Sequence, residues 1–269
     1  LKNASRTNTI FMGFFQFLGQ KVINFFREFG KIFTLLYRII SYFPQAFRNK
    51  RLVFEQMAII GADSLPLVLL IGSFTGAIAA LQATSLFDKF NMMEIARPFL
   101  GASISTVVFQ ELTPVLTALV IAGRIGASMT AQIGSMQVTE QIDALEIMAI
   151  DKNRYLGMPR VLAALLMMPI LAIFSSIIAL LGAFIMVALK FNINASLYFE
   201  SIKNFFVIKE LIVCLTKSAL FGGITALIGV YVGFSTTGGA EGVGYSAVKS
   251  FTISAASILI LDALLGTIL

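Results

Sequence analysis

The chain has 269 residues, of which 58% are hydrophobic and 13% are charged, with a mean hydropathy of +0.89 and a net charge of +6. A soluble domain of this length needs far more polar surface, and several apolar stretches reach the roughly 20 residues that cross a bilayer as helix. With no histidine and one cysteine, Cys214, the chain lacks an internal disulfide, the usual zinc or haem ligands and a Ser-His or Cys-His pair. We therefore expect an all-α membrane protein without metal, cofactor or nucleic-acid partner. Its positive charge would interact with anionic lipid headgroups and set the orientation of the spans.

Residues 14–41 predict an amphipathic helix lying in the membrane surface. At 100° per residue, one side gathers Gln20, Asn24, Arg27, Lys31, Thr34 and Arg38. The other side gathers Phe15, Leu18, Val22, Phe25, Phe26, Phe29, Phe33, Leu36 and Ile40. A tilted spanning helix is the alternative, which mid-helix charges disfavour because they are costly in lipid. These charges, and the lack of a cleavage site, also disfavour a cleavable signal peptide.

Residues 1–63 thus form an N-terminal cytoplasmic and interfacial segment, and residues 64–269 form a transmembrane domain. Its five predicted spans lie at about 64–87, 103–124, 158–189, 209–234 and 250–269. Two pairs of small residues have the spacing that lets helices approach closely: Gly72 with Gly76, and Gly222 with Ala226.

Basic residues predict the orientation of the spans. With the N-terminus in the cytoplasm, fourteen Lys and Arg lie in cytoplasmic segments and five lie on the opposite side. The cytoplasmic segments are then 1–63, 123–160 and 235–249. The positive-inside rule therefore predicts a cytoplasmic N-terminus and an outer C-terminus.

An acidic stretch, "VTEQIDALEIMAID" at residues 138–151, falls between spans two and three on the cytoplasmic side. On a helical wheel, Glu140, Asp143 and Glu146 share one arc. The opposite arc holds Val138, Ile142, Leu145 and Ala149. This pattern predicts a short helix at about 135–150 that presents carboxylates to a partner, although an ordinary solvated loop helix has the same spacing.

Three ionisable residues lie inside the predicted spans: Glu111, Lys217 and Asp262. Counting from the span ends at about 1.5 Å per residue places all three about 10–12 Å below the outer boundary. Intramembrane charges are functional candidates, so these residues either pair or line a polar cavity; a structural ion pair is the alternative. Glu111 is the better gate candidate, because the nearby Pro114 loosens its helix.

No nucleotide-binding motif is present in the sequence. The glycine-rich stretch "TTGGAEGVG", residues 236–244, follows no strand and matches neither phosphate-binding pattern, so we interpret it as a flexible connection between spans. If ATP drives this protein, another subunit must bind it.

Together these stretches resemble the MlaE-type permeases, the membrane subunits of ABC transporters that act on lipids with MCE-domain proteins. The central stretch, residues 110–163, is "QELTPVLTALVIAGRIGASMTAQIGSMQVTEQIDALEIMAIDKNRYLGMPRVLA". "GSFTGAIAALQ", "TTGGAEGVGYSAVKSF" and "LILDALL" also resemble the family, so the similarity covers roughly residues 65–269. The family often has Arg and Gly where this chain has Gln110 and Thr113, which puts a headgroup-phosphate contact at that position in doubt.

The resemblance implies a homodimer in the inner membrane, flanked by cytoplasmic ATPase subunits and topped by a periplasmic MCE-domain protein, with a phospholipid or related lipid as substrate. The permease itself would not be an enzyme. The helix that docks on the ATPase would use Glu140, Gln141, Asp143, Leu145 and Glu146. The substrate path or gate would include Gln82, Glu111, Lys217 and Asp262.

Three other functions remain open from the residues alone. An ion-coupled secondary transporter would use Glu111, Lys217 and Asp262, although neither an inverted repeat nor paired broken helices support it. An intramembrane enzyme is disfavoured by the absence of histidine and of a paired-carboxylate motif at a span end. A non-transporting scaffold is the third alternative.

Overall fold

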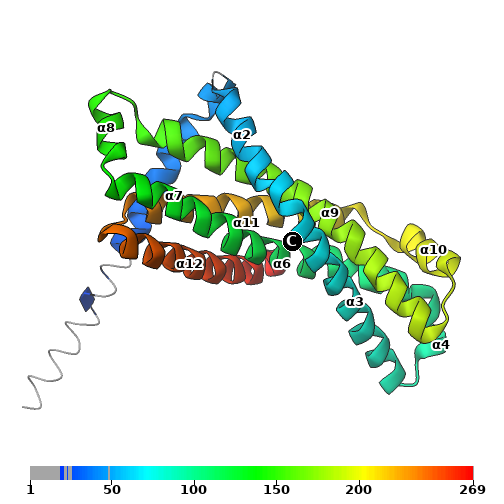
Figure 1. Ribbon diagram of the computed structural model, residues 1–269. Helices are drawn as coiled ribbons and strands as arrows, with labels where there is room; N and C mark the ends of the chain where they lie inside the picture. Colours follow the sequence, from blue (N-terminus) through cyan, green and yellow to red (C-terminus); the bar gives the residue numbers. More distant parts are fainter. Residues whose placement is uncertain (1–18, 21–22, 24–25, 48, 269) are drawn as a thin grey trace, which may run out of the picture.

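The computed structural model describes residues 19–20, 23, 26–47 and 49–268 (Figure 1). Within these residues the chain is helical and contains no strand, and five helical stretches are long and apolar enough to cross a membrane. They are Lys50–Lys89, Glu94–Val138, Asn153–Phe191, Ile208–Phe234 and Gly239–Ile268. The predicted all-α class with five spans is therefore confirmed.

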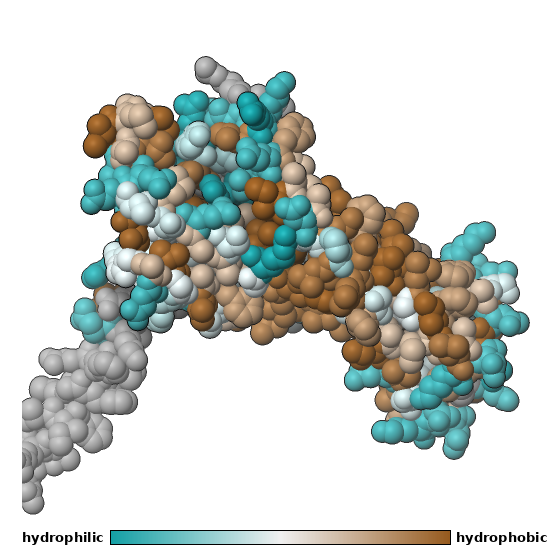
Figure 2. All heavy atoms as spheres, in the orientation of Figure 1, coloured by the Kyte–Doolittle hydropathy of each residue, from teal (hydrophilic) through white to brown (hydrophobic). Residues whose placement is uncertain are grey.

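Each stretch is longer than the span predicted from hydropathy. An apolar window detects only the part that fits a core about 30 Å thick, whereas a helix continues past it into polar surroundings. In Figure 2, hydrophobic residues form a belt across the middle of the molecule, and hydrophilic residues gather at both ends.

The first span is broken by a short turn. Helix α2 (Lys50–Ile60) ends where the N–H of Gly61 bonds to the carbonyl oxygen of Met57, and a 3-10 turn, Ala62–Ser64, leads into α3 (Leu65–Lys89). Pro66 stands at the start of α3, where its missing N–H costs no helical hydrogen bond.

The second span contains two π-helical turns. Its order is α5 (Leu100–Val107), the π-turn Val108–Leu112, α6 (Thr113–Ile121), the π-turn Ala122–Gly126 and α7 (Ala127–Val138). The first π-turn ends two residues before Pro114, whose ring and missing N–H disturb the backbone hydrogen bonds of the helix. The loosening expected near Glu111 is therefore present as a widened turn.

The acidic stretch forms a shorter helix than predicted. Helix α7 runs to Val138, Glu140 adopts a left-handed backbone conformation with φ of 59°, and α8 covers only Gln141–Ile147. Of the predicted apolar back, Ile142 is buried and Leu145 is half-buried, whereas Ala149 lies beyond the helix. The turn at Glu140 projects α8 away from α7 (Figure 1).

The later spans are α9 (Met158–Phe191), preceded by the π-turn Asn153–Gly157, α11 (Ile208–Phe234) and α12 (Gly239–Ile268). Between α9 and α11, α10 (Ala195–Phe205) lies beside α5 and the 3-10 turn Arg97–Phe99, which follows α4 (Met93–Ala96). The interpretation of residues 236–244 as a flexible connection is wrong for most of them. Residues 236–238 form the connection, Gly238 and Gly239 take positive φ at the turn, and residues 239–244 form the start of α12.

The N-terminal helix covers 26–41 among the described residues and is followed by a 3-10 turn at Phe43–Phe47. Leu35 and Ile39 are buried in the same core cluster as residues of spans one to five. An adjoining stripe is apolar and exposed: Phe26, Phe29, Phe33, Tyr37 and Ile40. The remaining face carries Arg27, Lys31, Thr34 and Arg38. The predicted residues Phe15, Leu18, Val22, Asn24 and Phe25 lie outside the described part.

Glycines bring α3 and α9 into backbone contact. A Cβ on Gly76 would lie 1.7 Å from the carbonyl oxygen of Ala179, and one on Gly72 would lie 2.7 Å from that of Ser175. Gly222 of α11 similarly faces Met168 and Ala164 of α9. The close approach predicted from the small-residue spacing is confirmed at both helix pairs.

We predict that Gly76→Ala lowers the free energy of unfolding by about 2–3 kcal/mol, because the methyl group forces two backbones apart. Gly30→Ala is the matched control, since a Cβ there meets nothing within 4 Å. It should leave stability unchanged or raise it by up to about 1 kcal/mol. Thermal unfolding in detergent measures both, and equal melting temperatures for the two variants would contradict the packing argument.

Candidate substrate path and coupling surface

The three intramembrane charges meet. The Nζ of Lys217 on α11 donates a hydrogen bond of 2.9 Å to Oε1 of Glu111 and one of 2.8 Å to Oδ1 of Asp262 on α12. The common depth inferred from sequence therefore corresponds to direct contact. One ammonium between two carboxylates joins spans two, four and five and leaves one net negative charge.

Burial differs sharply among the three side chains. Lys217 is 1% exposed and Asp262 is 19% exposed, but Glu111 is 49% exposed. Glu111 sits on the π-turn Val108–Leu112, beside Gly266 of α12. The network therefore has a closed side, at Lys217, and an open side, at Glu111.

Gln82 lies in a groove between α3 and α5. The groove has a volume of about 680 Å³ and an apolar wall that includes Ile78, Leu86, Val107 and Leu112. Its polar positions are Gln82, Ser85, Lys89 and Ser103. Within the described residues, no hydrogen bond joins Gln82 to the charged network, but Leu112, the neighbour of Glu111 in the chain, lines the groove.

The predicted coupling residues divide into two groups. Glu140, Gln141 and Asp143 are exposed, whereas Leu145 is half-buried. Glu146 pairs with Lys152 at 2.9 Å. The residues that follow are apolar and open, with Ile147 87% exposed and Met148 61% exposed. The surface of α8 thus combines carboxylates with an apolar tip, and the sequence pattern did not identify this tip.

The segment after α8 is fastened to the N-terminal helix. Tyr42 donates a hydrogen bond of 3.0 Å to Oδ2 of Asp151, and this bond together with the carboxylate charge raises the pKa of the phenol. The ammonium of Lys152 also lies 5.5 Å from the ring centre of Phe234, at the end of α11. These contacts join elements far apart in sequence, so no local pattern could predict them.

Three further polar residues lie inside the helical stretches beyond those predicted. Glu210 is buried and accepts a hydrogen bond of 2.8 Å from Thr106; Arg160 is buried and donates to the carbonyl oxygen of Leu156 at 3.0 Å. Arg124, on the second π-turn, donates to Ser64 at the break in the first span. Hydropathy placed these residues within two residues of the ends of the predicted spans, which is why they were missed.

Among the described residues, no group of three His, Cys, Asp and Glu is arranged to hold a metal ion.

The family profile described as "Permease MlaE" matches residues 53–268. The chain belongs to the MlaE permease family. A probable ABC transporter permease protein of Synechocystis is 36% identical over 235 residues, covering 87% of this chain and 88% of that protein. A probable ABC transporter permease protein of Rickettsia typhi is 34% identical over 94% of this chain and 96% of its own length. Another, of Pyropia yezoensis, is 32% identical over 89% of this chain and 90% of its own length.

This MlaE-family chain is therefore the permease subunit of an ABC transporter and a multi-pass membrane protein. In such transporters a permease works with an ATPase in general, which agrees with the lack of a nucleotide-binding motif in this sequence. The charged network and α8 are the two regions of the permease structure considered below.

We predict that Lys217→Met lowers the free energy of unfolding by about 3–5 kcal/mol, because two carboxylates lose their buried cation. Glu111→Gln should cost about 1 kcal/mol or less, since that side chain is half exposed and Lys217 keeps Asp262. The triple variant Lys217→Met, Glu111→Gln, Asp262→Asn should recover most of the loss. Melting temperatures in detergent measure all three; a Lys217→Met protein as stable as wild type would show that the network does not hold the spans.

Proposed function

We propose that this permease moves a phospholipid or related lipid between the inner membrane and a periplasmic MCE-domain protein, powered by a separate ATPase. The observation that carries the proposal is Glu111, a half-exposed carboxylate of a charged network at membrane depth, next to a large apolar groove. A charge facing hydrocarbon is costly, so Glu111 needs a polar cavity in front of it. A cavity with apolar walls and one charged region suits an amphiphile.

The groove supports a lipid rather than a small polar substrate. Its wall of Ile, Leu, Val and Phe side chains suits acyl chains, and its polar positions are few and separated. A headgroup would lie near Glu111. Lys217 is 1% exposed and already paired with two carboxylates, so Lys89, an exposed residue that lines the groove, is the cation open to a headgroup phosphate.

A second copy of the permease would close the cavity. Only 11% of the apolar window of α12 is buried, and its open residues include Tyr245, Val248, Leu259, Ile260 and Leu264. Lipid could cover this face, but lipid cannot solvate Glu111 beside the end of α12. A homodimer formed along α12 would cover the apolar face and enclose Glu111 in a shared polar space.

The proposal includes the orientation that the basic residues predict. With the N-terminus cytoplasmic, α8 lies on the ATPase side, and α4 and α10 lie on the periplasmic side, where the MCE-domain protein would sit. The exposed apolar stripe on helix 26–41 supports an N-terminal helix seated in the membrane surface. The C-terminus would then be periplasmic.

Helix α8 would dock on the ATPase through its carboxylates and its apolar tip. Exposed large apolar groups flanked by charge are typical of protein interfaces, and Ile147 and Met148 have no described neighbours that cover them. The contacts Glu146–Lys152 and Lys152–Phe234 tie the docked helix to α9 and α11, so movement of α8 would reach the spans.

An ion-coupled secondary transporter is the second candidate, because the charged network could carry a proton or sodium ion. Proteoliposomes that hold the purified complex separate the two. We expect transfer of fluorescent phospholipid to an MCE-domain acceptor only with hydrolysable ATP, and no effect of collapsing ion gradients. Transfer by the permease alone on a proton or sodium gradient would overturn the proposal, and a complex that hydrolyses ATP without transfer would be a scaffold.

We predict that Glu111→Ala reduces lipid transfer about tenfold or more while leaving the complex assembled, because the polar contact in the cavity is lost and the Lys217–Asp262 pair remains. Transfer rate and size-exclusion profile measure the two effects. Glu55→Ala, the same change at an exposed carboxylate of α2 outside the groove, is the control. A fully active Glu111→Ala variant would remove this residue from the mechanism.

We predict that Glu140→Ala with Asp143→Ala reduces the ATPase recovered with tagged permease several-fold, and that adding Ile147→Ser reduces it further. These side chains are exposed and bond to nothing else described, so the permease fold should not change. Glu55→Ala is the matched control, because it removes an exposed carboxylate from α2. Unchanged ATPase yield for the triple variant would exclude α8 as the docking element.

A further inference from the structure

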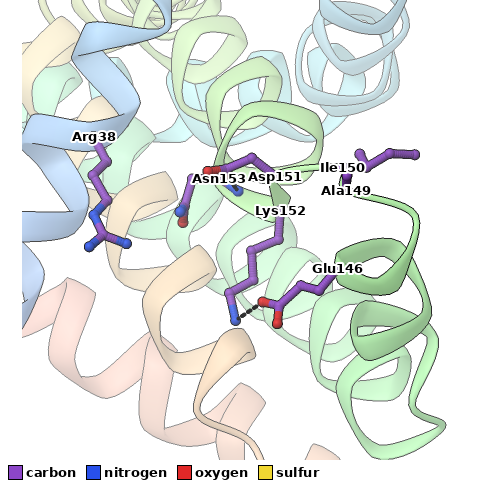
Figure 3. A pocket seen from close by; sticks show the side chains of 7 residues that line it. All are labelled: Arg38, Glu146, Ala149, Ile150, Asp151, Lys152 and Asn153. Carbon is purple, nitrogen blue, oxygen red and sulfur yellow. Dashed lines mark hydrogen bonds and ion pairs between the residues drawn. The ribbon is translucent and has the colours of Figure 1, made fainter.

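A second cavity, of about 310 Å³, lies between the N-terminal helix and the segment that follows α8 (Figure 3). Arg38 lines it from one side, and the chain from α8 to the start of α9 lines it from the other. The residues on that side are Glu146, Ala149, Ile150, Asp151, Lys152 and Asn153. In Figure 3 Arg38 lies on one side and Lys152 on the other, with the ammonium of Lys152 directed at Glu146.

The acids that line this cavity are already satisfied within the protein. Oδ1 of Asp151 accepts the backbone N–H of Asn153 at 2.7 Å and that of Arg154 at 3.2 Å, and Oδ2 accepts the Tyr42 hydroxyl. Glu146 is paired with Lys152. Arg38 has no carboxylate within 4.0 Å among the described residues. The cavity therefore has one positive charge without a partner.

The N-terminal helix carries Arg38 beside an exposed apolar stripe. Arg38 follows Tyr37 in the sequence, so the polar face of the helix borders the exposed apolar stripe that contains Phe33, Tyr37 and Ile40. A helix in the membrane surface buries its apolar face at the boundary of headgroups and acyl chains, and its polar face then lies among headgroups. The inference that follows rests on this proposed interfacial position.

We propose that the cavity binds the phosphate-bearing headgroup of an anionic phospholipid from the cytoplasmic leaflet. The planar guanidinium of Arg38 can donate two parallel hydrogen bonds to a phosphate, and Lys152, whose charge Glu146 already compensates, lines the other side of the cavity. The acyl chains would lie along the exposed apolar stripe of the helix. Such a lipid would bridge the N-terminal helix and the segment after α8, near the hydrogen bond between Tyr42 and Asp151. It is distinct from the transported lipid in the groove.

The test is a lipid titration of the purified transporter complex in detergent, with the melting temperature and native mass spectrometry as readouts. Phosphatidylglycerol should raise the melting temperature and remain bound, and phosphatidylcholine should do neither at the same concentration. Arg38→Gln should raise the phosphatidylglycerol concentration needed by about fivefold, the contribution of one basic residue at a membrane surface. Arg38→Lys should recover part of the loss.

Arg27→Gln is the matched control, because it removes the same charge from the polar face of the same helix, outside the cavity. It should titrate as wild type, and all variants should melt together without lipid. The proposal is overturned if Arg38→Gln titrates as wild type, or if inorganic phosphate alone gives the full stabilisation. It is also overturned if Arg38→Gln lowers the amount of ATPase recovered with the permease and leaves lipid binding unchanged. That result would place an acidic ATPase side chain in the cavity. Because the titration involves no transport, this result stands independently of whether lipid is the cargo.

Discussion

The structure depends on the requirement that a charge inside a membrane be paired. Lys217 is almost wholly buried, and its ammonium is compensated by two carboxylates from two other spans. Breaking such a pair leaves an uncompensated charge in a medium of low dielectric constant, so the contact fixes the register of α11, α12 and the π-turn of span two. Two acids for one base also leave a negative charge, which the half-exposed Glu111 presents outward.

Two parts of the bundle differ in packing and in helix regularity. Helices α3 and α9 touch backbone to backbone at Gly72 and Gly76, where any side chain would clash. Span two, in contrast, is interrupted by two π-turns that carry Glu111 and Arg124. Its cytoplasmic end leads through the left-handed turn at Glu140 into α8. One continuous stretch of chain thus connects the coupling surface with the open side of the charged network.

Sequence reasoning recovered the elements governed by composition and periodicity. Five spans, the close helix contacts at Gly76 and Gly222 and the shared depth of Glu111, Lys217 and Asp262 all follow from residue type and spacing. It failed where non-local geometry decides. The helix at 135–150 was divided by a backbone turn at Glu140, and residues 239–244 joined α12 although glycine is a poor helix former. The Tyr42–Asp151 contact and both cavities require the tertiary structure.

The function proposed for this permease requires that the open side of the charged network face the transported lipid. Cryo-electron microscopy of the complex in a lipid nanodisc, with and without a non-hydrolysable ATP analogue, tests this requirement. We expect lipid density between two permease copies, with a headgroup beside Glu111, and the Lys217–Asp262 contact intact in both states. Lipid density confined to the outer surface of the bundle, with Glu111 sealed against protein in both states, would contradict it.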